Sequence, residues 1–218
     1  VHTDGINTNC DIDVEWLTKR LRLILEATIP DVESKWIGLD KDVFKEGLWI
    51  QIGNYVLRNE DNSITKHGST FKASTRSKFY KSTIDKLIDA RLDNRVTQTF
   101  IDDLYDFDNL PIEDLLQRRT LNRKFEDYVS ETDMMIPLVK QGIEVGIQPE
   151  IRTTYNYYKT KEGYKIEQLV ESKTDLDVSY YWDIVSRLLI KFGLKHMIKK
   201  NPPLTILDRK QKSLMEWV

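Results

Sequence analysis

Two β-hairpin patterns, set among amphipathic helical segments, most constrain what this chain can fold into. The first joins the β-branched and aromatic residues 48–57 to residues 63–65 through a polar turn, and Gly68 closes it. The second joins residues 151–159 to residues 164–166 through a turn that ends in glycine. Hairpins without alternating βαβ units predict an α+β fold.

Apolar residues recur at helical spacing before, between and after the hairpins. The helices predicted in this way span residues 13–28, 79–92, 100–104, 111–118, 134–141 and 180–192. Pro30, Gly142 and Gly193 are expected to end three of them. The chain has 218 residues and is 40% hydrophobic, which is enough for a packed core. Apolar packing also explains the following aromatic residues, which we expect in the core: Trp16, Trp36, Trp49, Trp182, Tyr155, Tyr157 and Tyr158.

Composition excludes several classes of protein and indicates a compartment. The single cysteine, Cys10, cannot form an internal disulfide, which favours an intracellular, reducing location. No apolar run approaches the ~20 residues of a spanning helix, so no membrane partner is expected. The three histidines and the cysteine lack zinc-ligand spacing, and no phosphate-binding glycine loop is present.

Charge is balanced overall but unevenly placed. The formal net charge of -2 gives no global attraction to nucleic acid. Three local clusters are nevertheless basic. They are Lys66, Lys72, Arg76, Lys78 and Lys81 with His67; Arg118, Arg119, Arg123 and Lys124; and Arg187, Lys191, Lys195, Lys199 and Lys200. Residues 66–81 and 184–207 contain no acid at all. Such clusters either bind phosphates or form ordinary solvated helix faces.

Several short motifs occur in a fixed order along the chain. The first is Val-His-Thr-Asp-Gly-Ile at residues 1–6; its Thr-Asp-Gly triplet alone would be an ordinary turn. The later ones are Gly53-Asn54-Tyr55-Val56-Leu57, Ile64-Thr65-Lys66-His67-Gly68, Thr120-Leu121-Asn122-Arg123 with Tyr128, Tyr157-Tyr158-Lys159, and Tyr180-Tyr181. This ordered set resembles family B DNA polymerases. Taken in the same order, the first three segments are similar to the family's Tyr-x-Asp-Thr-Asp-Ser/Gly motif, its Lys-x-Tyr motif and the Lys-Gly segment that follows. The last three are similar to features of the family's thumb, namely the Leu-x-Lys/Arg…Tyr pattern, the hairpin and the last helix.

The resemblance implies the end of a palm, made of antiparallel hairpins with helices, at residues 1–95, followed by a mostly helical thumb at residues 96–218. It implies that Asp4 is a catalytic carboxylate and ligates Mg²⁺, in a two-metal site completed by residues outside this chain. The implied partners are primer–template DNA, an incoming dNTP, and the N-terminal palm, fingers and exonuclease portion of the polymerase. The implied location is the cytoplasm or the nucleoid or replication site. The implied DNA-binding residues are Asn54, Tyr55, Lys66, His67, Gly68, Lys72, Arg76, Arg119, Thr120, Arg123 and Tyr128.

Two departures from the family pattern keep alternatives open. His2 stands where the motif has its first Asp, and Gly53 stands where the family has Lys. Imidazole is a poor partner for Mg²⁺, which prefers oxygen ligands. The second hypothesis is therefore a polymerase-derived DNA-binding module with little or no catalysis. The third, motivated by the acidic stretch 102–108, is an unrelated protein-interaction domain.

Overall fold

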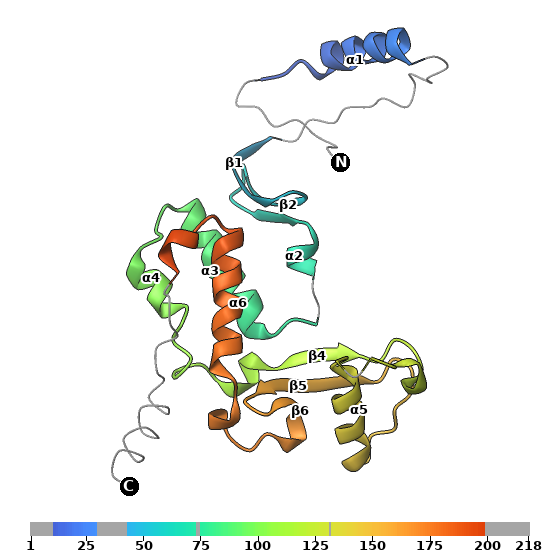
Figure 1. Ribbon diagram of the computed structural model, residues 1–218. Coiled ribbons are helices and arrows are strands. Elements are labelled where there is room, and N and C mark those ends of the chain that lie inside the picture. The colour runs from blue at the N-terminus through green and yellow to red at the C-terminus, as the bar shows by residue number, and fades with distance from the viewer. Residues whose placement is uncertain (1–10, 30–42, 73–74, 131, 199–218) are drawn as a thin grey trace. The chain divides into compact units, whose positions relative to one another are not determined.

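The computed structural model describes residues 11–29, 43–72, 75–130 and 132–198 (Figure 1). Within these ranges it confirms an α+β fold with two small antiparallel sheets. The α-helices are α1 (Val14–Thr28), α2 (Ser69–Lys72), α3 (Lys78–Leu92), α4 (Gln98–Asp103), α5 (Met135–Glu144) and α6 (Val178–Lys191). The strands are β1 (Phe44–Gln51), β2 (Asn54–Asn59), β3 (Ile64–His67), β4 (Gln117–Thr120), β5 (Thr154–Thr160) and β6 (Gly163–Ile166). Short 3-10 helices cover Ile112–Leu115, Phe125–Asp127, Glu167–Leu169, Lys173–Asp175 and Lys195–Met197.

The chain divides into two compact units. Residues 1–47 with 57–65 form unit 1, and residues 48–56 with 66–218 form unit 2. In unit 1, helix α1 confirms the helix predicted from its stripe of apolar residues. Its N-terminus is capped by Asp13, whose Oδ1 accepts a hydrogen bond from Trp16 N at 2.9 Å.

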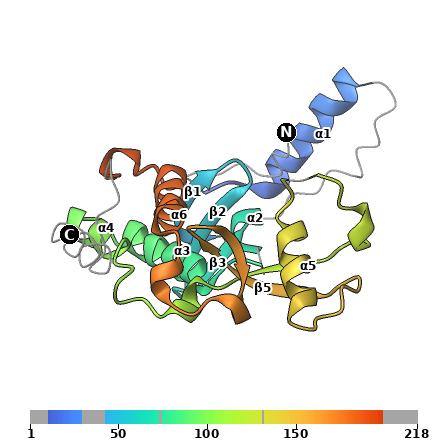
Figure 2. The ribbon, with the colours of Figure 1, turned by 60° about the horizontal axis from the view of Figure 1, so that its bottom comes forward.

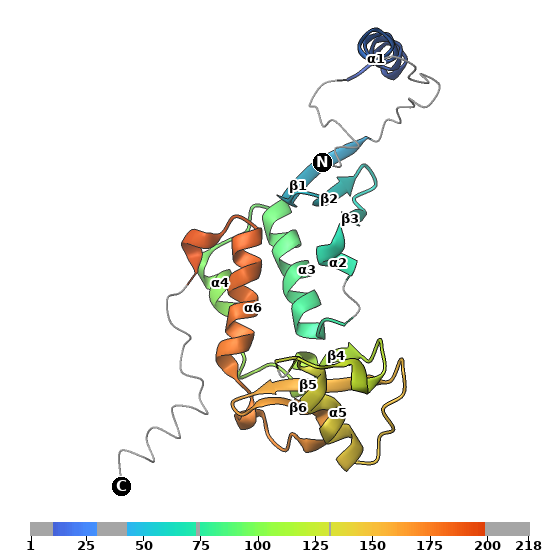
Figure 3. The same cartoon turned by 45° about the vertical axis from the view of Figure 1, so that its right-hand side comes forward.

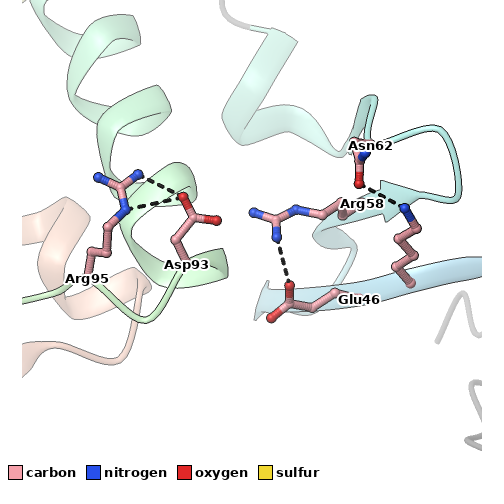
Figure 4. Close-up of polar contacts among 6 residues, drawn as sticks. Glu46, Arg58, Asn62, Asp93 and Arg95 are labelled. Carbon is pink, nitrogen blue, oxygen red and sulfur yellow. Dashed lines mark hydrogen bonds and ion pairs between the residues drawn. The ribbon is translucent and has the colours of Figure 1, made fainter.

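Polar contacts tie the hairpin residues of unit 1 together (Figure 4). Arg58 Nη1 lies 3.4 Å from Glu46 Oε2, and Lys45 Nζ donates to Asn62 Oδ1 at 2.9 Å. Asn62 has a φ of 66°, a left-handed conformation that asparagine tolerates in turns. The polar segment at 59–62 therefore forms the turn that the sequence predicts.

The strands β1, β2 and β3 are neighbours in that order in the first sheet. The prediction of one continuous extended segment at 48–57 is wrong. The chain turns at Ile52 and Gly53, and a further strand, β1, begins earlier, at Phe44. Gly53 has a φ of 69°, which a glycine adopts without the steric penalty that a Cβ brings.

The long helices α3 and α6 of unit 2 lie side by side (Figures 1 and 3). Both bury an apolar face, as their periodicity predicts. Trp182 of α6 is 5% exposed and its ring stacks on Tyr105 with centroids 3.8 Å apart, which confirms it as a core residue. The same expectation is wrong for Trp16 and Trp49, which are 62% and 49% exposed. Trp36 lies outside the described residues.

The second sheet has the order β4-β5-β6 and is antiparallel throughout. The predicted helix at 111–118 is wrong. Only Ile112–Leu115 form a 3-10 turn, and β4 follows, with Gln117 opposite Tyr157 and Thr120 opposite Thr154. The later part of the chain therefore contains a three-stranded sheet rather than one hairpin among helices.

Helix α5 packs against β5 and β6 (Figure 2). The buried residues at this contact are Leu121, Met135, Leu138, Val139, Tyr155, Tyr157 and Ile166. The prediction that α5 stops before Gly142 is wrong, because the helix continues to Glu144. A Cβ at Gly142 would lie 2.5 Å from Tyr155 Cε1, so the absence of a side chain lets the helix approach the sheet. Gly193, with a φ of 74°, follows the end of α6 as predicted.

Groups from the neighbouring helices complete the hydrogen bonding of the second sheet at two places. Gln141 of α5 donates from Nε2 to Tyr164 O at 3.0 Å and accepts at Oε1 from Ile166 N at 2.9 Å. Beyond the start of β4, the N-terminus of α6 takes the place of a neighbouring strand. Lys159 N donates to Tyr181 Oη at 3.1 Å, and Asp177 N donates to Lys159 O at 3.0 Å.

Candidate nucleic-acid interface

The predicted binding residues Asn54 and Gly68 form a clamp between β2 and the start of α2. Asn54 is 4% exposed; its Oδ1 accepts from Thr70 N at 2.8 Å and its Nδ2 donates to Ile52 O at 3.2 Å. Gly68 has a φ of 110°, and a Cβ there would overlap the carbonyl oxygen of Gly53. Asn54 therefore faces the interior, and both residues have a structural reason to be present.

Three rings lie in a row across the first sheet. Tyr55 of β2 stacks on His67 of β3 with centroids 4.6 Å apart and planes at 15°. Trp49 of β1 stacks on the same tyrosine at 6.4 Å and 21°. We call Trp49, Tyr55 and His67 the aromatic row. The structure thus brings together the predicted residues Tyr55 and His67, and it adds Trp49. The alternation of Trp49 with the core-directed strand residues could have signalled an outward side chain.

The lysines of the first basic cluster differ in whether they are paired with an acid. Lys66 Nζ lies 2.5 Å from Asp85 Oδ1, so this predicted phosphate ligand is already paired. The pair lies at a cavity of about 160 Å³ whose other lining residues are Thr70, Phe71, Tyr80, Lys81 and Ile84. Lys72 ends α2 and is exposed. Lys78, from the same basic cluster, is paired with Asp114 at 3.0 Å.

A backbone hydrogen bond joins two basic clusters that are about forty residues apart in the sequence. Arg118 N donates to Thr75 O at 3.1 Å, so the residues before α3 run beside β4. Arg76 lies 5.1 Å from the ring centroid of Tyr80 and, like Arg118 and Arg119, is exposed. We call Arg76, Arg118 and Arg119 the arginine junction.

The electrostatics of β5 place Arg76 and Arg119 on one side of the strand. Burial raises the pKa of Tyr157, and the positive charges of Arg119 and Arg76 oppose that rise. Burial also raises the pKa of the next residue, Tyr158, to about 12, and here the nearby charges of Glu167 and Glu113 add to the rise. Adjacent side chains of a strand point to opposite faces. Arg76 and Arg119 therefore lie toward Tyr157, whereas Glu167 and Glu113 lie toward Tyr158.

The loop after β4 holds the remaining predicted residues together. The guanidinium of Arg123 lies 4.2 Å from the ring centroid of Tyr128, whose Oη accepts from Asn122 N at 3.3 Å. Thr120 Oγ1 lies 3.0 Å from Thr154 Oγ1 across the strand pair, which engages its hydroxyl. Arg123 is exposed and so keeps donors available to a ligand.

The predicted metal ligand Asp4, its neighbour His2 and Cys10 lie outside the described residues. In residues 11–29, 43–72, 75–130 and 132–198, no cluster of three or more His, Cys, Asp or Glu side chains is placed to hold a metal ion. A search of the same ranges finds no helix that is both long and apolar enough to span a membrane.

Comparison with known proteins gives a likeness of fold. The sequence matches no family model and no curated protein. Among solved structures, the family B DNA polymerase from the hyperthermophilic archaeon Pyrobaculum calidifontis is similar, with a TM-score of 0.54 and 16% sequence identity. The likeness covers 84% of this chain and 24% of that polymerase, so the chain spans about a quarter of its length. At this identity the likeness shows the fold alone.

Proposed function

We propose that this chain is the palm-end and thumb portion of a family B-type DNA polymerase and binds primer–template duplex through its phosphates. The observation that carries the proposal is the arginine junction, where the backbone bond from Arg118 N to Thr75 O gathers cations from two distant segments. The distant likeness of fold to a family B DNA polymerase and the order of the sequence motifs support it.

The junction has the chemistry that a phosphate backbone requires. Each guanidinium presents several N–H donors in a planar fork that fits phosphate oxygens. Arg76 and Arg119 lie near Tyr157 from different elements, one before α3 and one on β4. Anchoring on two elements holds the charges at a fixed spacing, which reduces the conformational entropy lost on binding. Arg123, on its stack with Tyr128, would extend the interface along the duplex.

Salt-dependent binding of a labelled DNA hairpin duplex tests the proposal. The logarithm of the binding constant should fall linearly with the logarithm of salt concentration. The variant Arg76→Ala/Arg119→Ala should weaken binding and reduce that slope by about 0.9 for each phosphate that the protein no longer neutralises. An unchanged slope in this variant would rule out the junction as the phosphate site.

Arg95→Ala is the matched control. Arg95 is exposed and paired with Asp93 at 2.7 Å, just after the C-terminus of α3 (Figure 4). Helix α3 has 15 residues and its other end lies beside β4. At a rise of about 1.5 Å per residue, the control arginine is roughly 20 Å from the junction. It should leave the slope unchanged.

The catalytic part of the proposal concerns Asp4 and a partner. We propose that Asp4 supplies one carboxylate to a two-Mg²⁺ site and that the N-terminal palm, fingers and exonuclease portion of the polymerase, in the same polypeptide or in a partner subunit, supplies the rest and binds the dNTP. Two metal ions so held stabilise the attacking and leaving oxygens of a phosphoryl transfer. Primer extension by the reconstituted pair should be lost in Asp4→Ala, and extension that survives this change would refute the assignment.

A DNA-binding module without catalysis is the second candidate, and Gly53 favours it. Gly53 occupies a left-handed turn with a φ of 69°, where the family's lysine would be strained. A lysine at this position would therefore destabilise the turn by roughly 1–2 kcal/mol. This candidate predicts duplex binding without nucleotide incorporation, and His2→Asp should not restore incorporation. Normal extension with His2 in place would exclude it.

A further inference from the structure

We infer that Arg152 binds a backbone phosphate of nucleic acid, at a contact point separate from the arginine junction. This rests on the proposed binding of primer–template duplex and names a further residue for that interface. Arg152 lies just before β5, and no sequence motif points to it.

The backbone of Arg152 adopts a conformation that arginine disfavours. Its φ is 77°, in the left-handed region, where a Cβ comes too close to the following carbonyl oxygen. Among the described residues, the other positive φ angles outside glycine belong to Asn62 and Asn94, and asparagine tolerates this region. Local conformation therefore favours glycine or asparagine at position 152 and does not explain the arginine.

The positive φ is built into a β-bulge just beyond the end of β4. Arg152 N donates to Leu121 O at 2.7 Å, and Leu121 N donates to Thr153 O at 2.9 Å, so two residues of one segment lie opposite a single residue of the other. In bulges of this kind the first of the two residues is usually a glycine with positive φ. Thr153 N also donates to Glu150 O at 2.9 Å, which makes Arg152 the third residue of a tight turn. A positive φ at that position again favours glycine.

The side chain of Arg152 does nothing for the fold that would offset this cost. It is exposed, and within the part of the chain that the structure describes its guanidinium makes no hydrogen bond or ion pair. Glu150, two residues away, is exposed and is not paired with it. Backbone strain at a bulky residue is typical of positions where the side chain serves a function. The retained arginine therefore points to a ligand.

Charge identifies that ligand as an anion with a repeating backbone. Segments 117–124 and 151–160 both contain arginine and lysine and neither contains an acid. The two bonds at Leu121 tie these segments together, and Arg123, already stacked on an aromatic ring, follows two residues later. Arg152 and Arg123 are thus held by joined segments, and their planar forks of N–H donors suit phosphate oxygens.

Two variants that remove the same guanidinium separate binding from folding. Arg152→Gly relieves the strain, whereas Arg152→Ala keeps the Cβ that causes it. In fluorescence anisotropy with a labelled DNA hairpin duplex, both should bind about tenfold more weakly at low salt, and both should reduce the salt slope by about 0.9, as expected for one phosphate. In thermal unfolding, Arg152→Gly should raise Tm by about 2–4 °C and Arg152→Ala should leave it unchanged.

Arg95→Ala is the matched control, because it removes one exposed positive charge beyond the other end of α3. It should alter neither the affinity nor the salt slope. A protein that becomes more stable but binds duplex less well when Arg152 is replaced by glycine would show that this arginine serves binding rather than folding.

An unchanged salt slope in both Arg152 variants would overturn the inference, even if the affinity fell, because the loss would then be structural. A fall in Tm for Arg152→Gly would overturn it as well, since the side chain would then stabilise the fold. Unaltered binding in the Arg152 variants, with the slope still reduced in Arg76→Ala/Arg119→Ala, would refute only the Arg152 site. The reverse pattern would refute the arginine junction and leave Arg152 as a phosphate ligand. No duplex binding by the unaltered protein at low salt would refute both.

Discussion

Replacing Tyr181 with phenylalanine should destabilise unit 2 by more than the removal of one surface hydroxyl would. Tyr181 is 1% exposed and its Oη accepts the hydrogen bond from Lys159 N at 3.1 Å. In Tyr181→Phe the ring still fills its site, but the amide of Lys159 loses its acceptor. A buried donor left unsatisfied costs about 1–3 kcal/mol. We expect a loss of about 2 kcal/mol, which corresponds to roughly 4–8 °C in Tm for a chain of this size.

Tyr180→Phe is the matched control, because it makes the same chemical change one residue earlier. Tyr180 is half-buried, and its Oη donates to Gln117 Oε1 at 3.2 Å. Tyr157 Oη donates to the same oxygen at 3.3 Å, so the acceptor stays satisfied when one hydroxyl is removed. The control should cost only about 0.5–1 kcal/mol.

Urea unfolding followed by circular dichroism measures both losses, with a shifted midpoint and an unchanged slope expected for each variant. Hydrogen exchange gives the local readout, since the Lys159 amide should exchange faster in Tyr181→Phe and not in Tyr180→Phe. Equal midpoints for the two variants, together with unaltered exchange at Lys159, would refute the idea that α6 takes the place of a strand beside β5.

Three further results are expected. Gly142→Ala should destabilise the chain by up to about 2 kcal/mol in thermal unfolding, because the clash of its Cβ with the buried ring of Tyr155 costs about 1–3 kcal/mol and the gain in helix propensity offsets only about 1 kcal/mol. Gly68→Ala should cost at least about 2 kcal/mol in urea unfolding, because it adds a Cβ at positive φ that overlaps Gly53 O. Burial, aided by nearby carboxylates, raises the pKa of Tyr158 to about 12, above the unfolded value of about 10. Its contribution to stability is therefore complete below pH 10 and is lost as the pH rises from 10 to 12; alkaline unfolding should be less steep in Tyr158→Phe.

Local patterns in the sequence predicted those parts of the fold that local physics decides. The stripe at 79–92 became α3, Lys78–Leu92, because its apolar positions share one helical face and Ser77 accepts from Tyr80 N at the N-terminus. The turn at 59–62 has polar residues, and its asparagine tolerates a positive φ. In both cases the residues that determine the structure are close to one another in the sequence.

Tertiary pairing decided what the sequence could not show. Residues 117–120 carry no alternating apolar pattern, yet they form β4 because they pair with β5 more than thirty residues later. The turn at Ile52 and Gly53 breaks what looked like one strand, since isoleucine is an unusual turn residue. For the candidate site, proximity in sequence sufficed for the stack of Arg123 on Tyr128. The nearness of Arg76 to Arg119 depends on the Thr75–Arg118 bond, which no local pattern encodes.

The amide of Gln141 has a consequence for how this chain meets other chains. A free strand edge is a template on which another polypeptide can add a strand and begin aggregation. At β6 the backbone groups of Tyr164 and Ile166 that face α5 are held by one side chain, whose amide imitates a peptide group. Strand exchange at this edge would first have to break both bonds. Self-association through the β6 edge of the second sheet is thereby disfavoured. The Gln141 side chain covers this edge without an additional strand.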